Sequence, residues 1–242
     1  MASDFPVVFA LYPDVTQLDF TGPLEVLARL PRSRIVLAAT HGGELSAGGV
    51  TFADVRPLAQ VSECALLCVP GGFGCSAAMA DTEYLGALRR LAARARYTTS
   101  VCTGSLLLGA AGLLEGRRAA CHWAFRELLR LFGALPDARR VVRDGNVFTG
   151  GGVTAGIDMA LAISAEIAGE DHAQAVQLAM EYAPEPPFDA GRPERARPEI
   201  LAQARARFDR VWPERLAAAE RAARALGRDF ARAGGSDTLS CP

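Results

Sequence analysis

Cys102 is the residue whose type and position most strongly indicate chemistry. It stands between the apolar, β-rich run Tyr97–Val101 and a helix expected over Thr103–Ala111. A sharp strand-to-helix turn of this kind projects a nucleophile at the top of a sheet. The start of the helix favours a thiolate, and the N–H of Thr103 can donate to an anion that develops during a reaction. The sequence therefore predicts that Cys102 is a nucleophile, with a buried core cysteine as the alternative.

A glycine-rich loop is expected beside Cys102. The run Cys64–Pro70 is predicted to be a strand, and Gly71-Gly72-Phe73-Gly74 follows it. Because the carboxyl ends of parallel strands meet at one edge of a sheet, the N–H of Gly72 is a candidate second donor to the anion. The chain has six cysteines. Disulfides are not expected in a reducing compartment, and five cysteines are interpreted as structural thiols: Cys64, Cys68, Cys75, Cys121 and Cys241.

Asp19 is the candidate acid/base partner of the thiol. It lies between the predicted first strand, Val7–Leu11, and a helix that Thr21-Gly22-Pro23 is expected to open, with Thr21 as the cap. A carboxyl group beside a thiolate has a raised pKa, because two adjacent anions are disfavoured. Such a group can act as a general acid or base. The alternative is that Asp19 only caps a helix.

His122 is a weaker candidate, with three possible roles. It can be a base, an orienting hydrogen-bond donor, or a packed structural residue beside Trp123. No pair of closely spaced Cys or His residues is followed by a second such pair, so we predict no metal site. The run Gly150–Gly152 lacks the lysine and the spacing of a phosphate-binding loop, so a nucleotide cofactor is not expected.

Strand-like and helical runs alternate along the chain. This pattern is typical of α/β proteins with an open, largely parallel sheet that helices cover on both faces. Sites in such sheets lie at the carboxyl ends of the strands, which selects the loops containing Gly72, Cys102 and Gly150–Gly152. Further strands are predicted over Arg34–Thr40, Arg118–Cys121, Arg139–Arg143 and Val147–Thr149, the last two joined by a turn at Asp144-Gly145-Asn146. Further helices are predicted after Asp81 and over Trp123–Phe132, Ile157–Ala168 and His172–Tyr182.

Residues 191–242 are interpreted as a helical C-terminal extension of a main domain over residues 1–190. Helices are expected over Glu199–Trp212 and Glu214–Phe230, separated by Pro213, and a disordered tail over Gly234–Pro242. Apolar residues at helical spacing predict that the extension packs on the body or on a second subunit. A DNA-reading helix-turn-helix module is the alternative, although the extension is short for one and its charges are mixed.

Composition argues against several classes of function. The formal net charge is −1, which gives no support to a nucleic-acid partner. The first residues lack the basic start and apolar stretch of a signal peptide, and no apolar run reaches the roughly 20 residues of a membrane-spanning helix. We therefore expect a cytoplasmic protein that binds neither nucleic acid nor membranes.

Several motifs resemble those of a known superfamily. Val101–Ser105, Pro70-Gly71-Gly72 and Gln17–Pro23 resemble the class I amidotransferase-like superfamily, which includes the Parkinson-linked deglycase and the PfpI-type proteases. Longer blocks resemble, more narrowly, the isonitrile hydratases of that superfamily: Ala93–Tyr97, Gly109–Arg118, His122-Trp123, Val141–Asn146, Thr149–Asp158 and Val176–Phe188.

The resemblance implies a flavodoxin-like three-layer sandwich, a homodimer and a reaction without metal or organic cofactor. The implied substrate is a small-molecule isonitrile, R–N≡C, to which water adds to give an N-substituted formamide. The implied roles are Cys102 as nucleophile, Asp19 as acid/base and Thr103 beside the nucleophile.

Two other functions stay open. One is a glyoxalase or deglycase that acts on small carbonyl compounds. Such enzymes usually carry a glutamate near the end of the first strand, where this chain has Leu11-Tyr12-Pro13. The other is a ligand-sensing module related to transcription regulators, which normally append a helical DNA-binding domain.

Overall fold

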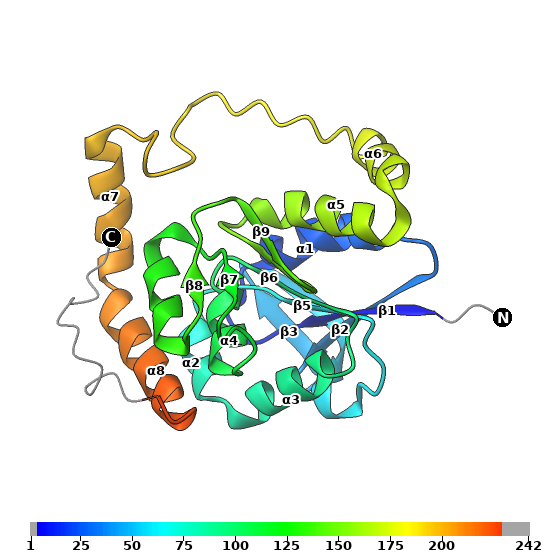
Figure 1. Cartoon of the computed structure of the whole chain (residues 1–242), viewed down its shortest axis with the longest axis horizontal. Coiled ribbons are helices and arrows are strands. Elements are labelled where there is room, and N and C mark those ends of the chain that lie inside the picture. Colours follow the sequence, from blue (N-terminus) through cyan, green and yellow to red (C-terminus); the bar gives the residue numbers. More distant parts are fainter. Residues whose placement is uncertain (1–3, 229–242) are drawn as a thin grey trace.

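A single eight-stranded sheet forms the centre of the computed structural model, which describes residues 4–228 (Figure 1). The strand order is β3-β4-β2-β1-β5-β6-β10-β9. Their bounds are Phe5–Ala10 (β1), Ser33–Ala39 (β2), Gly43–Ala47 (β3), Val50–Pro57 (β4), Leu66–Val69 (β5), Tyr97–Val101 (β6), Val141–Asp144 (β9) and Val147–Gly150 (β10). A separate two-stranded pair joins β7 (Arg118–Ala119) to β8 (Leu135–Pro136).

The interior of the sheet is parallel, and its two edge strands are antiparallel. Parallel pairing joins β2, β1, β5, β6 and β10. The edge strand β3 is antiparallel to β4, and the edge strand β9 is antiparallel to β10. β5 and β6 are buried along their whole length, because helices cover both faces of a parallel sheet. The predicted flavodoxin-like α/β fold with a mostly parallel sheet is confirmed.

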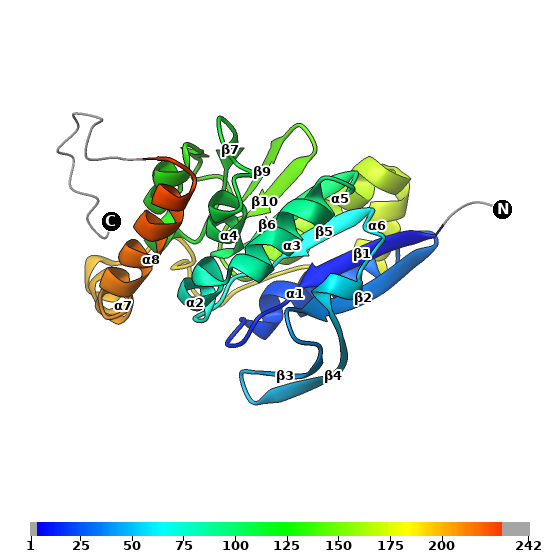
Figure 2. The same cartoon turned by 90° about the horizontal axis from the view of Figure 1, so that it is seen from below.

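Helices form the two outer layers. α1 (Gln17–Leu27) packs against α5 (Ala155–Ala168) on one face, and α6 (Glu170–Ala179) packs against α5. α2 (Cys75–Ala80), α3 (Thr82–Ala92) and α4 (Gly104–Ala110) pack together on the other face, in front of the strands in Figure 2. The 3-10 segment η2 (Trp123–Phe132) packs beside α4. Asp81 caps α3 by accepting a hydrogen bond from the Tyr84 N–H at 2.9 Å, as predicted.

The first helix begins one turn earlier than predicted. It starts at Gln17, with Thr16 as the residue before it. Thr21 is therefore not the cap; its hydroxyl donates back to the Gln17 carbonyl at 3.0 Å. Pro23 lies inside the helix. Asp19 consequently belongs to the first turn of α1 rather than to a loop, which gives its carboxyl group a fixed direction.

Four elements had no prediction from the sequence: the β3–β4 hairpin, the helix α2, the two-residue strand β8 and a short 3-10 turn at Leu58–Gln60. The hairpin turns at Gly48-Gly49, whose φ values are +59° and +83°, and much of it is exposed, so a hydrophobic pattern is weak there. The six residues of α2 are too few for helical periodicity to appear. The expected break at Pro213 is also wrong. α7 ends at Asp209, and Pro213 lies in the first turn of α8, where a missing N–H is tolerated.

The C-terminal arm, defined here as residues 198–228, packs on the body of the protein. It contains α7 (Pro198–Asp209) and α8 (Trp212–Ala225), which lie at the left of Figure 1, near the carboxyl ends of the strands. α8 packs on α2 and η2, and its buried side chains join the main hydrophobic core: Trp212, Ala218, Ala219, Ala222 and Ala223. The predictions for Phe230, Gly234–Pro242 and Cys241 lie outside the described residues. Within residues 4–228, no helix combines the length and apolarity needed to cross a bilayer.

Candidate active site

Three connections meet at the carboxyl edge of the sheet. Asp19 follows β1, Gly71 and Gly72 follow β5, and Cys102 follows β6. The chain reverses direction across the sheet here, since β2 lies on one side of β1 and β5 on the other. Such a switch point leaves a crevice outside the strand ends. The topology therefore brings together residues that are more than eighty positions apart in the sequence.

Cys102 occupies a strained turn. Its φ is +59°, a left-handed conformation that few non-glycine residues adopt outside functional sites. Its N–H donates to the carbonyls of Gly150 at 3.1 Å and Gly151 at 2.7 Å, and its carbonyl accepts from the His122 N–H at 3.3 Å. These bonds hold the turn, so the predicted strand-to-helix elbow is present.

Asp19 is fully buried, and only one of its two carboxyl oxygens accepts a hydrogen bond within the described residues. Its Oδ2 accepts a hydrogen bond from the Gly71 N–H at 2.9 Å. Its Oδ1 is buried with no nitrogen or oxygen partner in the part of the chain that the structure describes, and the Cys102 thiol is the side chain that interacts with the carboxyl. Burial raises the pKa of Asp19 to about 7, against the stabilising effects of the Gly71 N–H and the Cys102 thiol. Asp19 can therefore hold or release a proton near neutral pH.

The thiol of Cys102 is not the stabilised thiolate that the sequence predicts. Burial raises the pKa of Cys102 above its ordinary value, and the nearby negative charge of Asp19 raises it further. The Thr103 N–H acts in the opposite direction, as the helix-start argument requires, but desolvation is the larger effect. Burial and the neighbouring carboxylate therefore favour the protonated thiol.

Thr103 and Gly72 are linked to each other. The Gly72 N–H donates to Thr103 Oγ1 at 3.0 Å, so the second donor predicted for an anion is engaged within the protein. The Thr103 N–H is the backbone donor directed at the Cys102 sulfur. Thr103 thus has two roles, with its N–H at the thiol and its side chain holding the glycine loop in place.

Gly71 lies where Asp19 and Thr103 converge. A Cβ atom built at Gly71 would stand 2.5 Å from Thr103 N, 2.7 Å from Thr103 Oγ1 and 2.8 Å from Asp19 Oδ2. These separations are too short for any real side chain. Only glycine lets the loop pass between the two residues.

Gly71→Ala is expected to lower kcat/KM about 100-fold for any reaction at this site, because displacing reacting groups by about 1 Å has an effect of that size. The matched control is Gly86→Ala, since a Cβ at the helical Gly86 meets no atom within 4 Å. Steady-state kinetics of both variants test this. Equal activities for Gly71→Ala and wild type would contradict the close approach of the loop.

A cavity of about 240 Å³ opens beside Cys102. The candidate residues Gly72, Cys102, Thr103 and His122 line it. The remaining lining residues are mostly apolar: Thr16, Phe73, Phe125, Val153, Phe208, Val211 and Arg215. The arrangement fits a small molecule that presents a reactive atom to the thiol and a hydrocarbon group to the wall.

His122 lies in the cavity wall as a neutral ring. Burial and the charge of Arg215 lower the pKa of His122 to about 4. Its Nδ1 accepts a hydrogen bond from the Ala124 N–H at 3.3 Å, so the proton is on Nε2. His122 caps η2 and packs beside Trp123, which satisfies the structural interpretation, and Nε2–H remains a possible donor.

Phe208, Val211 and Arg215 were not among the predicted site residues. All three belong to the C-terminal arm and line the cavity. The helical spacing of Phe208 and Val211 predicted a packed face, but it gave no information on what that face covers. Arg215 carried no sequence signal, because a charged residue in a helix rich in charged residues indicates a solvated surface.

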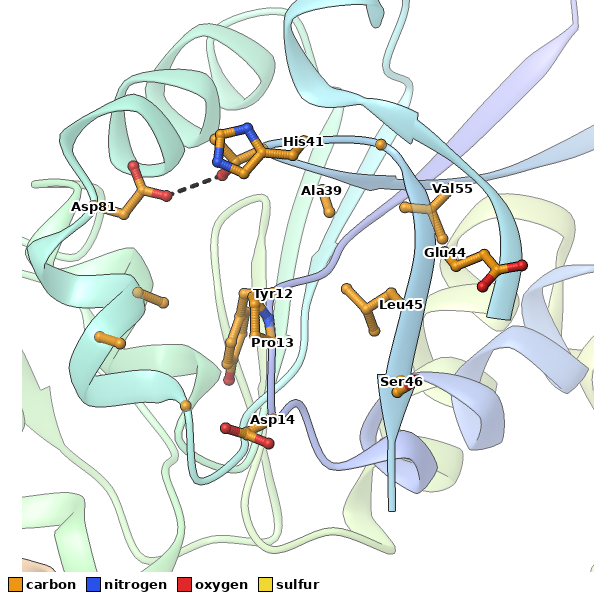
Figure 3. Close-up of a pocket in the computed structure, with 15 residues that line it drawn as sticks. Tyr12, Pro13, Asp14, Ala39, His41, Glu44, Leu45, Ser46, Val55 and Asp81 are labelled. Carbon is orange, nitrogen blue, oxygen red and sulfur yellow. Dashed lines mark hydrogen bonds between the residues drawn. The ribbon is translucent and has the colours of Figure 1, made fainter. Parts of the chain in front are cut away.

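A larger cavity of about 510 Å³ lies elsewhere, between the β3–β4 hairpin and the segment from α2 to α3 (Figure 3). Its wall includes Tyr12, Asp14 and Asp81 but none of the five predicted site residues. The Thr40 hydroxyl donates to Asp81 there at 3.0 Å. The smaller cavity is therefore the better candidate, because four of the five predicted site residues line it.

No cluster of three or more Cys, His, Asp or Glu residues with metal-binding geometry occurs between residues 4 and 228. Among the cysteines, Cys64, Cys68, Cys75 and Cys121 are free and buried, as expected of structural thiols.

Known proteins share this fold and much of this sequence. The profile of the DJ-1/PfpI family matches residues 6–166. An isonitrile hydratase of Pseudomonas putida is 49% identical over 90% of this chain and 96% of its own length. The crystal structure of a ThiJ/PfpI family protein from Pseudomonas syringae has a TM-score of 0.84 at 37% identity and covers 91% of each chain. The HTH-type transcriptional regulator CdhR of Pseudomonas aeruginosa is 30% identical over 75% of this chain but only 55% of its own length.

Proposed function

The chain belongs to the DJ-1/PfpI family, and we propose that it hydrates isonitriles to N-substituted formamides. One observation carries the proposal, the buried pair of Cys102 and Asp19, with the unpaired Oδ1, beside a mainly apolar cavity. The 49% identity to an isonitrile hydratase over nearly the whole chain supports it. An isonitrile carbon must gain both a proton and a nucleophile, and this pair supplies one of each.

The first half of the reaction uses the proton of the Cys102 thiol. The Asp19 carboxylate accepts the thiol proton of Cys102 and delivers it to the lone pair of the terminal carbon of R–N≡C. The thiolate attacks the same carbon, which forms the C–S bond of a thioimidate, R–N=CH–S–Cys. Asp19 is then again a carboxylate. The Thr103 N–H next to the sulfur stabilises the thiolate as it forms.

The second half releases the product. The Asp19 carboxylate takes a proton from water as the water oxygen adds to the thioimidate carbon, and passes that proton to the nitrogen. Collapse of the resulting R–NH–CH(OH)–S–Cys breaks the C–S bond and returns the thiol proton, which leaves R–NH–CHO. The overall balance is one isonitrile and one water to one formamide, with no change in oxidation state. An alternative route leaves Cys102 as a polarising group while Asp19 activates water directly.

The pH profile follows from Asp19. Its carboxylate must be ionised to accept the thiol proton, and its pKa is about 7. Below that pH the carboxyl is protonated and the pair holds two protons. We therefore expect kcat/KM to fall about tenfold per pH unit below about pH 6 and to level off above about pH 8. A profile that stays flat across this range would contradict the assignment of Asp19.

The direct test incubates the purified protein with cyclohexyl isocyanide and follows N-cyclohexylformamide by gas chromatography. Methylglyoxal in parallel tests the glyoxalase alternative. Turnover of the isocyanide without turnover of methylglyoxal supports the hydratase. The reverse result would replace it with the carbonyl-directed function.

The sensing-module alternative has less support. The matched regulator extends well beyond the aligned region, whereas the isonitrile hydratase and this chain align over nearly their full lengths. The arm also packs on the body through α8. An electrophoretic mobility shift with random duplex DNA is expected to give no complex.

We also propose a homodimer in the cytoplasm, as the family resemblance implies. Several large apolar side chains are exposed, Leu18 on α1 and Val50 on the β3–β4 hairpin among them, which leaves apolar surface for such a contact. Light scattering coupled to gel filtration is expected to give the mass of two chains. The mass of one chain would contradict the dimer.

A further inference from the structure

We propose that the C-terminal arm determines which isonitriles the site accepts, and that it selects compact, apolar N-substituents. This inference rests on the proposed function and adds the substrate class. Phe208 and Val211 line the cavity from the side of the arm, and Cys102 and Thr103 line the same cavity from the main sheet. An isonitrile that presents its carbon to Cys102 must therefore direct its substituent within the same small space.

The ring of Phe208 is held by other aromatic rings. Its centroid lies 5.0 Å from that of His122, 5.4 Å from that of Trp123 and 5.6 Å from that of Phe125. Edge-to-face contacts at these distances are favourable. Phe125 in turn stacks on Trp212 of α8 at 5.9 Å. The wall is thus a packed cluster between the arm and η2, so its shape constrains what fits beside it.

Arg215 fastens the arm to the glycine loop of the site. Arg215 is 2% exposed as a residue, and its guanidinium donates through Nη2 to the Gly72 carbonyl at 3.2 Å and the Phe73 carbonyl at 3.1 Å. Nε donates to the Ser76 hydroxyl at 3.2 Å, and the group lies 4.8 Å over the Phe125 ring. No carboxylate within residues 4–228 forms an ion pair with it. A buried cation held by carbonyl dipoles and a ring fixes the arm against the loop that holds Asp19 and Thr103.

Size and polarity of the cavity define the substituent. Its volume of about 240 Å³ lies below the range of drug-sized ligand pockets, which begins at about 300 Å³. Of the three arm side chains in the wall, Phe208 and Val211 are hydrocarbon, and the Arg215 guanidinium is engaged by the Gly72 and Phe73 carbonyls. His122 is neutral because its pKa is lowered to about 4. A branched or cyclic alkyl group fits this environment.

The test compares kcat/KM for methyl and cyclohexyl isocyanide in the full-length protein. Phe208→Ala is expected to lower the cyclohexyl-to-methyl ratio about tenfold, because only the larger substrate reaches the wall. Phe208→Trp is expected to lower the same ratio by crowding the cavity. Leu201→Ala is the matched control, a half-buried apolar truncation on α7 outside the cavity wall, and should keep the wild-type ratio. Unchanged ratios in both Phe208 variants, or an equal loss for both substrates, would overturn the inference.

A second readout does not depend on turnover. Methyl and cyclohexyl methanethiosulfonate modify thiols, and peptide mass spectrometry locates the modification at Cys102. Phe208→Ala is expected to lower the rate for the cyclohexyl reagent relative to the methyl reagent, because the larger group loses the ring that lines the cavity beside the thiol. If wild-type protein hydrates neither isonitrile, the proposed function fails, and these relative rates still decide whether the arm controls access. Identical relative rates in wild type and Phe208→Ala would overturn it.

Discussion

Cys102→Ala is expected to lower kcat for isonitrile hydration by at least about 10⁴-fold, the order of loss when a covalent nucleophile is removed. Without the sulfur, no C–S bond forms and Asp19 receives no thiol proton to deliver. The substitution removes one buried atom, so the fold should persist. The measurement is formamide production under saturating cyclohexyl isocyanide.

The control for this loss is Cys64→Ala. Cys64 is also a buried thiol, but it precedes β5 at the opposite end of the sheet from the site. We expect its removal to leave kcat within about twofold of wild type and to affect only stability. Near-full activity in Cys102→Ala would instead assign the chemistry to the route in which Asp19 activates water.

Asp19→Asn is the second large effect, with an expected fall in kcat/KM of about 10²- to 10⁴-fold, the range for removal of a general acid or base. The asparagine carbonyl can still accept the Gly71 N–H bond that Oδ2 accepts in the wild type. It cannot take a proton from the thiol or give one to carbon. The variant therefore separates proton transfer from the shape of the site.

Stability measurements distinguish this effect from unfolding. The folded-state pKa of Asp19 is about 7, above its usual 3.8. The folded state therefore binds more protons than the unfolded state between these values, and Asp19 makes the wild type less stable as pH rises through that range. Asparagine does not titrate, so the variant loses no stability in this way as pH rises. At about pH 8 it should therefore melt at the same temperature as wild type or above it. A lower melting temperature at that pH would mean that the activity loss is structural.

The placement of Cys102, Asp19 and Gly72 was predictable from the sequence because it depends on local patterns. The β-rich run before Cys102 and the Thr103-Gly104 that follows specify an elbow, and parallel strand ends bring Asp19 and Gly72 to one edge. The start of α1 was misplaced because Thr21 and Pro23 imitate a helix start, although the helix continues through Pro23.

Two features of the site were beyond local patterns. The high pKa of Cys102 results from burial by segments distant in sequence. The start of a helix does lower this pKa through the Thr103 N–H, as predicted, but local sequence gives no measure of the larger effect of burial. The arm reaches the cavity from more than one hundred positions beyond Cys102, and the roles of Phe208 and Arg215 depend on tertiary contacts. Helical spacing fixes which side chains share a face but not which surface that face meets.

The most direct test of the account is rapid-quench mass spectrometry of the intact protein after mixing with cyclohexyl isocyanide. We predict a species heavier by the mass of one intact isonitrile, located on the Cys102 peptide, that forms and decays at the rates required by formamide production. Formamide produced at the full rate without any such adduct on Cys102 would contradict the covalent mechanism.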